Sequence, residues 1–400
     1  MGPLEQENEE HYPSQATSDQ PVRIRFYGHL RSGFGLAGGA RATARTLEAV
    51  GCKLSYCDLA LTSHAAIQQL PLSDWDPSDG KVRPFMDLVH TNPNVLASNP
   101  ELLEQHSLKA PLRIGYWAWE LEQFPAGWEA YFAGYDEIWC PSTFTAQALA
   151  QRSPVPVIAL PHLPDWSHLE RRAAKRNEAR TTQAQRPFTF LTLFDFWSTT
   201  ERKNPAAVIE AFHRAFPPQR DEGPSVQLLI KASSAEQFPK QAQALQSLAK
   251  GDPRIRWITT LLPQADLDRL YAQADALVSL HRAEGFGLTL ADAMAMGLPV
   301  IATGYSGNLD FMPPGSAALI PWQPTTIART CGDYMAGAIW AEPDCDAAAR
   351  TMQRLASNRE FASHLGRQGQ KAVRERLSCP KLTGIVRQRL GRWLLNSLNR

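Results

Sequence analysis

Apolar and polar positions follow a regular order along most of the chain. Residues 22–26 alternate as a strand does, a glycine-rich loop follows, residues 40–50 have the pattern of a helix, and 53–57 that of a second strand. This order predicts a βαβ unit, which belongs to a parallel sheet covered by helices on both faces. The same pattern continues with strands predicted at 86–90, 112–116, 137–140 and 155–160 and a helix at 144–151.

A second series of the same kind begins after a break in the pattern. Residues 165–187 hold many basic and few apolar side chains, so we expect an interdomain linker with a surface segment. The strands predicted beyond it are 188–194, 225–231, 255–259, 276–280 and 300–303, and the helices are 205–215, 234–249 and 265–273. The predicted fold class is therefore α/β, with two Rossmann-like, doubly wound parallel sheets.

The domain division follows from these patterns. The N-terminal domain is expected at 21–164 and the C-terminal domain at 188–375, joined by the linker at 165–187. Residues 1–20 are polar and acidic, which predicts a disordered leader. Residues 376–400 read as an amphipathic helical segment, and we expect that segment to pack back on the N-terminal domain.

Composition excludes several classes of protein. Hydrophobic residues make up 44% of the 400 positions and charged residues 20%, which rules out large-scale disorder. The 41 basic and 40 acidic residues nearly cancel, so no nucleic-acid partner is expected. The six cysteines are scattered, which favours a reduced chain in the cytoplasm. Neither a secretory signal nor an apolar run long enough for a transmembrane helix is found, whereas a peripheral contact at the inner membrane face stays open.

The stretch from 280 to 300 is the most informative part of the sequence. An apolar strand leads into a glycine-rich loop, and a helix that is apolar all round follows from about 289 to 296. The loop therefore opens onto a buried helix N-terminus at the carboxyl edge of a sheet, where free amides and the helix dipole favour a phosphate. The residues predicted to bind a donor here are Gly285, Phe286, Gly287, Leu288 and Thr289.

Two carboxylates flank this loop, and each has two interpretations. Asp292 completes Thr289-x-x-Asp292, which is the spacing of a capping box at the helix start. Glu284 precedes the glycines, where a solvated loop carboxylate is one explanation. Alternatively, Glu284 and Asp292 hydrogen-bond hydroxyls on either side of a phosphate held between them. That arrangement suits a nucleotide sugar.

Glu284-Gly-Phe-Gly-Leu with an acid eight positions later, followed by Ala-Met-Ala-x-Gly-x-Pro-Val-Ile-Ala, resembles the E-x7-E signature of glycosyltransferase family 4. The first half adds Gly115-Tyr-Trp-Ala-Trp-Glu120, which is similar to bacterial polysaccharide mannosyl- and rhamnosyltransferase-like members. This resemblance implies a retaining enzyme with the GT-B fold, in which two Rossmann-like domains face a cleft. It also implies that Glu284 binds hydroxyls of the donor sugar and that Asp292, here in place of the usual Glu, binds the ribose.

Departure of a nucleoside diphosphate develops negative charge that fixed cations must stabilise. Arg202 and Lys203 lie between a predicted strand and helix, so a catalytic role for both is predicted, with two solvated basic residues as the alternative. The resemblance implies an Arg five residues before the Lys, but Ser198 stands there, and we consider Arg202 as its substitute. Lys231 ends a strand and either contacts the donor or extends its amine to solvent.

The first half contains further candidates. Gly33 and Gly35 begin a G-x-G-x-x-G pattern after a strand and are predicted to face the donor. His90 ends a strand and is a candidate catalytic residue, with a structural histidine as the alternative. Trp117, Trp119 and Glu120 are candidate acceptor residues, because aromatic faces stack on sugars, although simple packing explains them equally.

The predicted function is transfer of a hexose or deoxyhexose from a nucleotide-diphosphate sugar to a hydroxyl of a glycan or lipid-linked acceptor. No cofactor and no metal are expected, because both Asp-x-Asp strings sit where acids complement a helix N-terminus. One alternative is a catalytically silent GT-B subunit that binds a sugar. A second is an NAD-dependent Rossmann oxidoreductase, which the first-half glycine pattern and Asp58 permit.

Overall fold

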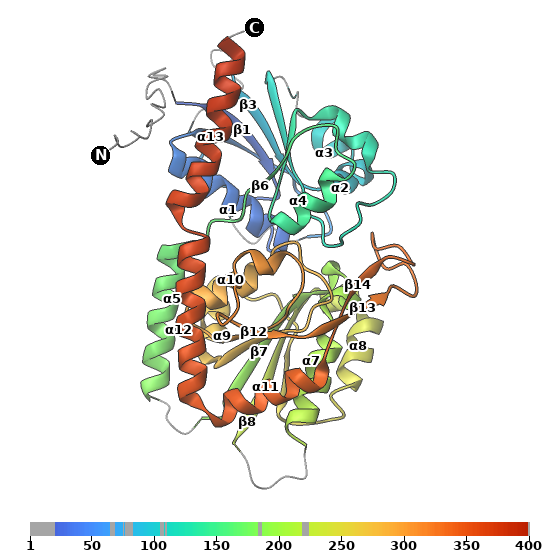
Figure 1. The fold of residues 1–400 in the computed structure, drawn as a ribbon, viewed down its shortest axis with the longest axis vertical. Coiled ribbons are helices and arrows are strands. Elements are labelled where there is room, and N and C mark those ends of the chain that lie inside the picture. Colours follow the sequence, from blue (N-terminus) through green and yellow to red (C-terminus); the bar gives the residue numbers. More distant parts are fainter. Residues whose placement is uncertain are drawn as a thin grey trace, which may run out of the picture.

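The computed structural model describes residues 21–64, 69–74, 76, 83–104, 108, 110–182, 186–217 and 224–398. The leader expected at 1–20 lies outside these residues. Two six-stranded parallel sheets dominate the part of the chain that is described, and they lie one above the other in Figure 1. A two-stranded antiparallel hairpin extends from the second half of the chain.

The first sheet has the order β2-β1-β3-β4-β5-β6. Its strands are β1 (Arg23–Gly28), β2 (Lys53–Asp58), β3 (Met86–His90), β4 (Leu112–Tyr116), β5 (Glu137–Cys140) and β6 (Val157–Ala159). Its helices are α1 (Gly35–Val50), α2 (Pro93–Ser98), α3 (Glu101–Glu104) and α4 (Thr143–Ala150), with a 3-10 turn η2 (Glu129–Gly134). Apolar residues of α1 pack on one face of the sheet, and those of α4 on the other.

The second sheet has the order β12-β11-β10-β7-β8-β9. Its strands are β7 (Phe188–Asp195), β8 (Val226–Ser233), β9 (Ile255–Ile258), β10 (Ala276–Ser279), β11 (Val300–Thr303) and β12 (Ala318–Ile320), and the hairpin is β13 (Trp322–Thr326) and β14 (Ile339–Pro343). The helices are α6 (Thr200–Lys203), α7 (Pro205–Ala215), α8 (Pro239–Ser247), α9 (Gln264–Gln273), α10 (Leu288–Ala295), α11 (Cys345–Ser357) and α12 (Arg359–Arg376), with 3-10 turns η3 (Phe196–Ser198), η4 (Ala235–Gln237) and η5 (Gly307–Asp310).

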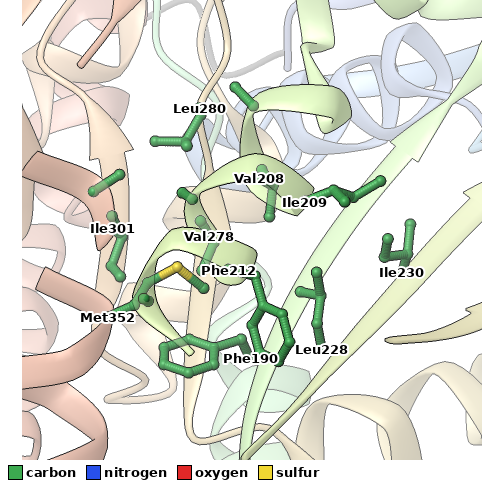
Figure 2. Close-up of a cluster of buried hydrophobic side chains, with 14 of the residues drawn as sticks. Phe190, Val208, Ile209, Phe212, Leu228, Ile230, Val278, Leu280, Ile301 and Met352 are labelled. Atoms are coloured by element: carbon green, nitrogen blue, oxygen red, sulfur yellow. The ribbon is translucent and has the colours of Figure 1, made fainter. Parts of the chain in front are cut away.

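Both faces of the second sheet are buried, as a parallel sheet requires. Figure 2 shows one face, where Phe190 and Leu228 of the sheet meet Phe212 of α7 and Met352 of α11. Residues of α9, α10 and α12 cover the opposite face. The sequences of the central strands are therefore largely apolar. Polar residues lie instead on the loops that follow the carboxyl ends of these strands.

The expectation of a core-poor linker at 165–187 differs from the structure. Helix α5 (Trp166–Thr182) occupies most of this range and packs against α9. Two of its basic residues, Arg172 and Arg176, are buried and have hydrogen-bond partners. Arg172 donates to Asp268 at 2.6 and 2.8 Å, and Arg176 donates to the carbonyl of Ala274 at 3.3 Å. Charged side chains thus occupy buried helix positions in a segment that was predicted to contribute little to a core.

Helix α13 (Cys379–Leu398) carries the chain back from the second sheet to the first. Figure 1 shows α12 and α13 following one another along one side of the molecule, with α13 beside α1. Val386 and Leu390 join the core of the first sheet. Arg389 forms a bidentate ion pair with the buried Glu137 of β5. None of the helices described is both long and apolar enough to cross a membrane.

Candidate active site

A cavity of about 390 Å³ lies where the carboxyl ends of the two sheets face each other. The loop between β10 and α10 and the segment from η3 to α6 contribute the walls from the second sheet. The first sheet contributes the start of α1 and the ends of β3 and β4. Both loops of the second sheet thus bring their polar residues to one space, as expected for the carboxyl edge of parallel strands.

Glu284 is the central carboxylate of this cavity. Its side chain is 10% exposed, forms an ion pair with Lys203, and lies 3.5 Å from Arg202. Burial alone would raise the pKa of Glu284, but the charges of Lys203 and Arg202 outweigh burial and lower the pKa to about 2. Glu284 is therefore ionised throughout the neutral range. The solvated-loop interpretation does not fit this buried, paired carboxylate.

Arg202 is committed to backbone groups. Nη1 donates to the carbonyl of Ala283 at 2.8 Å and Nη2 donates to the carbonyl of Ser198 at 3.0 Å. Its guanidinium also lies over the ring of Tyr334, 5.7 Å from the centroid. Burial alone would lower the pKa of Arg202, but Tyr334 and two nearby carboxylates outweigh it and raise the pKa. Both terminal nitrogens of the Arg202 guanidinium thus bind backbone carbonyls, whereas Lys203 lies beside Glu284 at the cavity wall.

The glycine-rich loop ends in a helix start without a side-chain cap. Gly287 is the N-cap of α10 with a φ of 94°, in the left-handed region that favours glycine. A Cβ at Gly287 would also lie 2.9 Å from the side chain of Leu290. Thr289 therefore lies inside the helix, and the capping box that was one interpretation of Thr289 and Asp292 is not formed. The first amides of α10 stay available to an anion.

Asp292 lines a second cavity of about 400 Å³ rather than the one that holds Glu284. The two cavities share the lining residues His162, Phe286, Leu288 and Thr289, so they adjoin at the start of α10. Burial raises the pKa of Asp292, and the charges of Arg172 and Arg45 oppose that shift. Glu284 and Asp292 thus lie on two adjoining cavities.

Four of the expected donor or acceptor residues do not line the cavity of Glu284. Besides Asp292, these are Gly33, Trp117 and Lys231. Lys231 donates to the hydroxyl of Ser233 at 2.8 Å. Trp117 is fully buried and packs on Phe132 with ring centroids 4.8 Å apart, so its side chain belongs to the core and does not face an acceptor sugar. Those that do line it are His90, Gly35, Trp119, Glu120, Arg202, Lys203, Glu284, Gly285, Phe286, Gly287, Leu288 and Thr289.

His90 is a buried imidazole at the end of β3. Its ring stacks on Tyr116 with centroids 4.0 Å apart, and neither ring nitrogen has a hydrogen-bond partner among the residues described. Burial lowers the pKa of His90, and the neighbouring His162 adds to that shift. His90 is therefore a neutral group on the cavity wall with unused hydrogen-bonding capacity.

Several lining residues carried no signal in the sequence. The loop between β13 and β14 brings Asp333 and Tyr334 to the cavity, where the Tyr334 hydroxyl donates to Glu120 at 2.8 Å. Trp197 of η3 and His64 beyond β2 lie on the same wall, with ring centroids 5.3 Å apart. These four residues meet at the cavity because the hairpin loop extends to the first domain and the two domains pack against each other. Local sequence patterns therefore did not indicate them.

The dinucleotide pattern of the first half does not have the expected geometry. β1 ends at Gly28 and α1 begins at Gly35, so the glycines do not form an immediate strand-to-helix turn. Asp58, the acid that would bind a ribose, accepts hydrogen bonds from the amides of Leu30 and Arg31 at 2.8 and 3.3 Å. The carboxylate of Asp58 therefore stabilises the loop of its own domain.

Possible metal ligands are engaged elsewhere. Asp344 caps α11 by accepting from the amide of Ala347 at 2.9 Å, and Asp346 pairs with Arg214. Asp266 and Asp268 of α9 pair with Arg269 and Arg172. In the described parts of the chain, no group of three or more His, Cys, Asp or Glu side chains is placed to hold a metal ion.

Two parallel α/β sheets whose carboxyl ends face a shared cavity define the GT-B class. Sucrose-phosphate synthase from Thermosynechococcus elongatus matches with a TM-score of 0.63 at 16% identity, over 94% of this chain and 100% of that chain. Anabaena Alr3699/HepE, solved in complex with UDP-glucose, matches with a TM-score of 0.60 at 12% identity, over 92% and 99%. The chain therefore has the GT-B fold.

Sequence comparison adds the class of the second domain. Residues 196–358 match the family described as Glycosyl transferases group 1, so this part of the chain is a glycosyltransferase group 1 domain. A trehalose synthase from Rubrobacter xylanophilus is 28% identical over 204 residues, which are 50% of this chain and 42% of that protein. The chain spans less than half the length of the curated relatives it matches.

Proposed function

We propose that this protein is a retaining glycosyltransferase of family 4 that uses a nucleotide-diphosphate sugar. The observation that carries the proposal is the partly buried Lys203–Glu284 ion pair beside the uncapped start of α10 in the interdomain cavity. Group 1 similarity over 196–358 supports the class of reaction, and a fold relative solved with UDP-glucose supports the class of donor. The transferred group would be a hexose or deoxyhexose, in the synthesis of a glycan.

Each group at the site has a place in this reaction. The amides at the start of α10 bind the diphosphate, and the ammonium of Lys203 forms an ion pair with it. Glu284 is an acceptor-only carboxylate and orients hydroxyls of the donor sugar, while the neutral His90 offers a further hydrogen bond to the sugar. Asp292 lines the adjoining cavity and would bind the ribose of a nucleotide that extends past Leu288.

The bond changes balance without a protein nucleophile. The bond from the anomeric carbon to the diphosphate oxygen breaks, and its electron pair leaves with the phosphate. The acceptor oxygen bonds to the same face of the anomeric carbon, and its proton passes to the leaving phosphate oxygen. Glu284 is held by two cations and does not attack, so retention follows from attack on the departure face. Lys203 and the helix amides stabilise the developing charge.

Two other functions are weaker. A silent sugar-binding subunit would not need a cation that pairs with a carboxylate beside an anion site. A nicotinamide-dependent oxidoreductase would need Asp58 free for a ribose, but Asp58 is bonded to its own loop.

Nucleoside diphosphate release from UDP-, GDP-, dTDP- and ADP-sugars by the purified protein tests the proposal. Release from at least one donor, unchanged by EDTA and lost in Glu284→Gln, is expected, with the exposed Glu236→Gln as the matched control. The anomeric configuration of the product, read by NMR, is expected to match that of the donor. No release from any donor, or wild-type release by Glu284→Gln, would refute the proposed function.

A further inference from the structure

The cavity has a second group of polar and aromatic residues that the donor chemistry does not use. They come from four separate segments: the residues after β2, helix α2, turn η3, and the loop between β13 and β14. We call this group the outer rim, and it consists of His64, Asn94, Trp197 and Asp333.

Close contacts connect the members of the outer rim. Trp197 lies against His64, and Asn94 Nδ2 donates to Asp333 at 2.8 Å. The loop that carries Asp333 approaches the segment that carries Trp197, because a Cβ at Gly332 would lie 3.2 Å from the Thr199 hydroxyl. The outer rim is therefore one continuous wall formed by both domains.

Two hydrogen-bond acceptors of this wall face the cavity. Asn94 donates one of its two amide hydrogens to Asp333, and its Oδ1 is buried without a partner among the residues described. Asp333 adds a carboxylate that accepts only, when ionised. A buried acceptor without a partner costs free energy until a donor fills it, so this wall favours a ligand that brings hydroxyl groups.

Trp197 adds an apolar surface. Its side chain is 44% exposed, unlike the buried tryptophans Trp117 and Trp119, and it borders the cavity beside the imidazole of His64. An exposed indole next to hydroxyl-accepting groups suits the apolar face and the polar edge of a sugar ring.

Charge excludes one large class of sugars. Arg202 and Lys203 are the only lysine or arginine side chains among the described residues that line this cavity, and both are engaged near Glu284. Burial lowers the pKa of His64, so its imidazole is neutral at neutral pH. Two further carboxylates, Glu120 and Asp333, face the same space. A phosphate or carboxylate group on the ligand would be repelled here.

We propose that the outer rim is the acceptor subsite and that it accepts an uncharged saccharide rather than a sugar phosphate. This inference rests on the proposed function, since an acceptor is needed only if the protein transfers a sugar. Asn94 and Asp333 hold acceptor hydroxyls and Trp197 supports one face of the ring.

The first experiment compares neutral and charged acceptors. Nucleotide release from the most active donor is measured alone and with D-glucose, D-mannose, L-rhamnose, their methyl glycosides, maltose, glucose 6-phosphate and fructose 6-phosphate. At least one neutral sugar is expected to raise release by about tenfold with saturation, and more than either sugar phosphate. Greater stimulation by a sugar phosphate, or stimulation by none of these compounds, would overturn the inference.

Variants then test the residues. Asp333→Asn and Trp197→Ala are each expected to raise the KM for the stimulating sugar by about tenfold, and to change the KM for the donor much less. Asp346→Asn, an exposed carboxylate on α11, is the control and changes neither constant. Asp333→Lys should shift the preference towards glucose 6-phosphate. An unchanged acceptor KM in Asp333→Asn overturns the inference.

These outcomes are separate from failure of the proposed function. If the protein releases no nucleotide from any donor, the glycosyltransferase assignment itself is wrong. If release occurs and depends on Glu284, but the acceptor KM is indifferent to Asp333 and Trp197, only the acceptor subsite is wrong.

Discussion

Arg202 Nη1 donates to the carbonyl of Ala283 at 2.8 Å, one residue before the carboxylate of Glu284. The amide of Arg282 donates in return to the carbonyl of Arg202 at 2.8 Å. Two loops that follow different strands of the second sheet are thus joined directly. We therefore propose that Arg202 is a positioning residue and that Lys203 is the cation that contacts the donor diphosphate.

Replacing Arg202 by lysine keeps the positive charge but removes the two guanidinium nitrogens that donate to separate carbonyls. One ammonium cannot donate to the carbonyls of Ala283 and Ser198 together, so the loop carrying Glu284 loses its support. Arg202→Lys is expected to reduce kcat by about 100-fold and to lower Tm. Steady-state kinetics and thermal melts check this, with the exposed Arg171→Lys as the control. Activity within about threefold of the wild type would contradict the positioning role.

Gly307 allows the loop of Glu284 to pass close to η5. A Cβ at Gly307 would lie 2.1 Å from the carbonyl oxygen of Gly285 and 2.8 Å from the Ser142 hydroxyl. Gly307→Ala is therefore expected to displace this loop, lower the free energy of unfolding by about 1–3 kcal/mol and reduce turnover. Gly384→Ala in α13 is the control, because no atom lies within 4 Å of its added Cβ. Equal stability of the two variants would argue against this packing.

We expect His162 to make the free energy of unfolding depend on pH. Burial lowers the pKa of His162 to about 3, below the value of about 6.5 for an unfolded histidine. The unfolded chain therefore takes up a proton below pH of about 6.5 that the folded chain does not, so stability falls as the pH decreases through this window. Between pH of about 6.5 and 5.5, one such histidine costs about 1 kcal/mol.

His162→Gln removes this contribution. In urea unfolding at the two ends of that window, the loss of stability on acidification should be about 1 kcal/mol smaller in the variant than in the wild type. The exposed His364→Gln serves as the control. A variant that loses as much stability as the wild type would show that His162 is not held neutral.

The pair between Arg389 and Glu137 attaches α13 to the first sheet. Glu137 is fully buried and also accepts from the indole of Trp139 at 2.6 Å. Arg389→Met leaves this carboxylate without its cation, which should cost about 3–5 kcal/mol of unfolding free energy. Arg392→Met, at an exposed position of the same helix, is the control. Chemical denaturation measures both, and a loss below about 1 kcal/mol for Arg389→Met would contradict the prediction.

Helix α5 shows why the linker prediction differed from the structure. Leu169, Arg172 and Arg176 follow one another at helical spacing and face α9, but two of the three are charged. Hydrophobic periodicity detects a buried face only when the buried residues are apolar. Here Asp268 and a helix-end carbonyl compensate for burial of the cations, and those partners lie about a hundred residues away.

Local sequence determined the strands, the α/β class and the glycine loop before α10, because each depends on neighbouring residues and backbone preferences. It also indicated Glu284 and Lys203, since residues after parallel strands gather at one edge. Only the tertiary structure decided that Lys231 and Asp292 lie off the cavity of Glu284 and that Arg202 binds the backbone. It alone brought Asp333 and Tyr334 to the first domain, because contacts between distant segments depend on how the sheets and the hairpin pack.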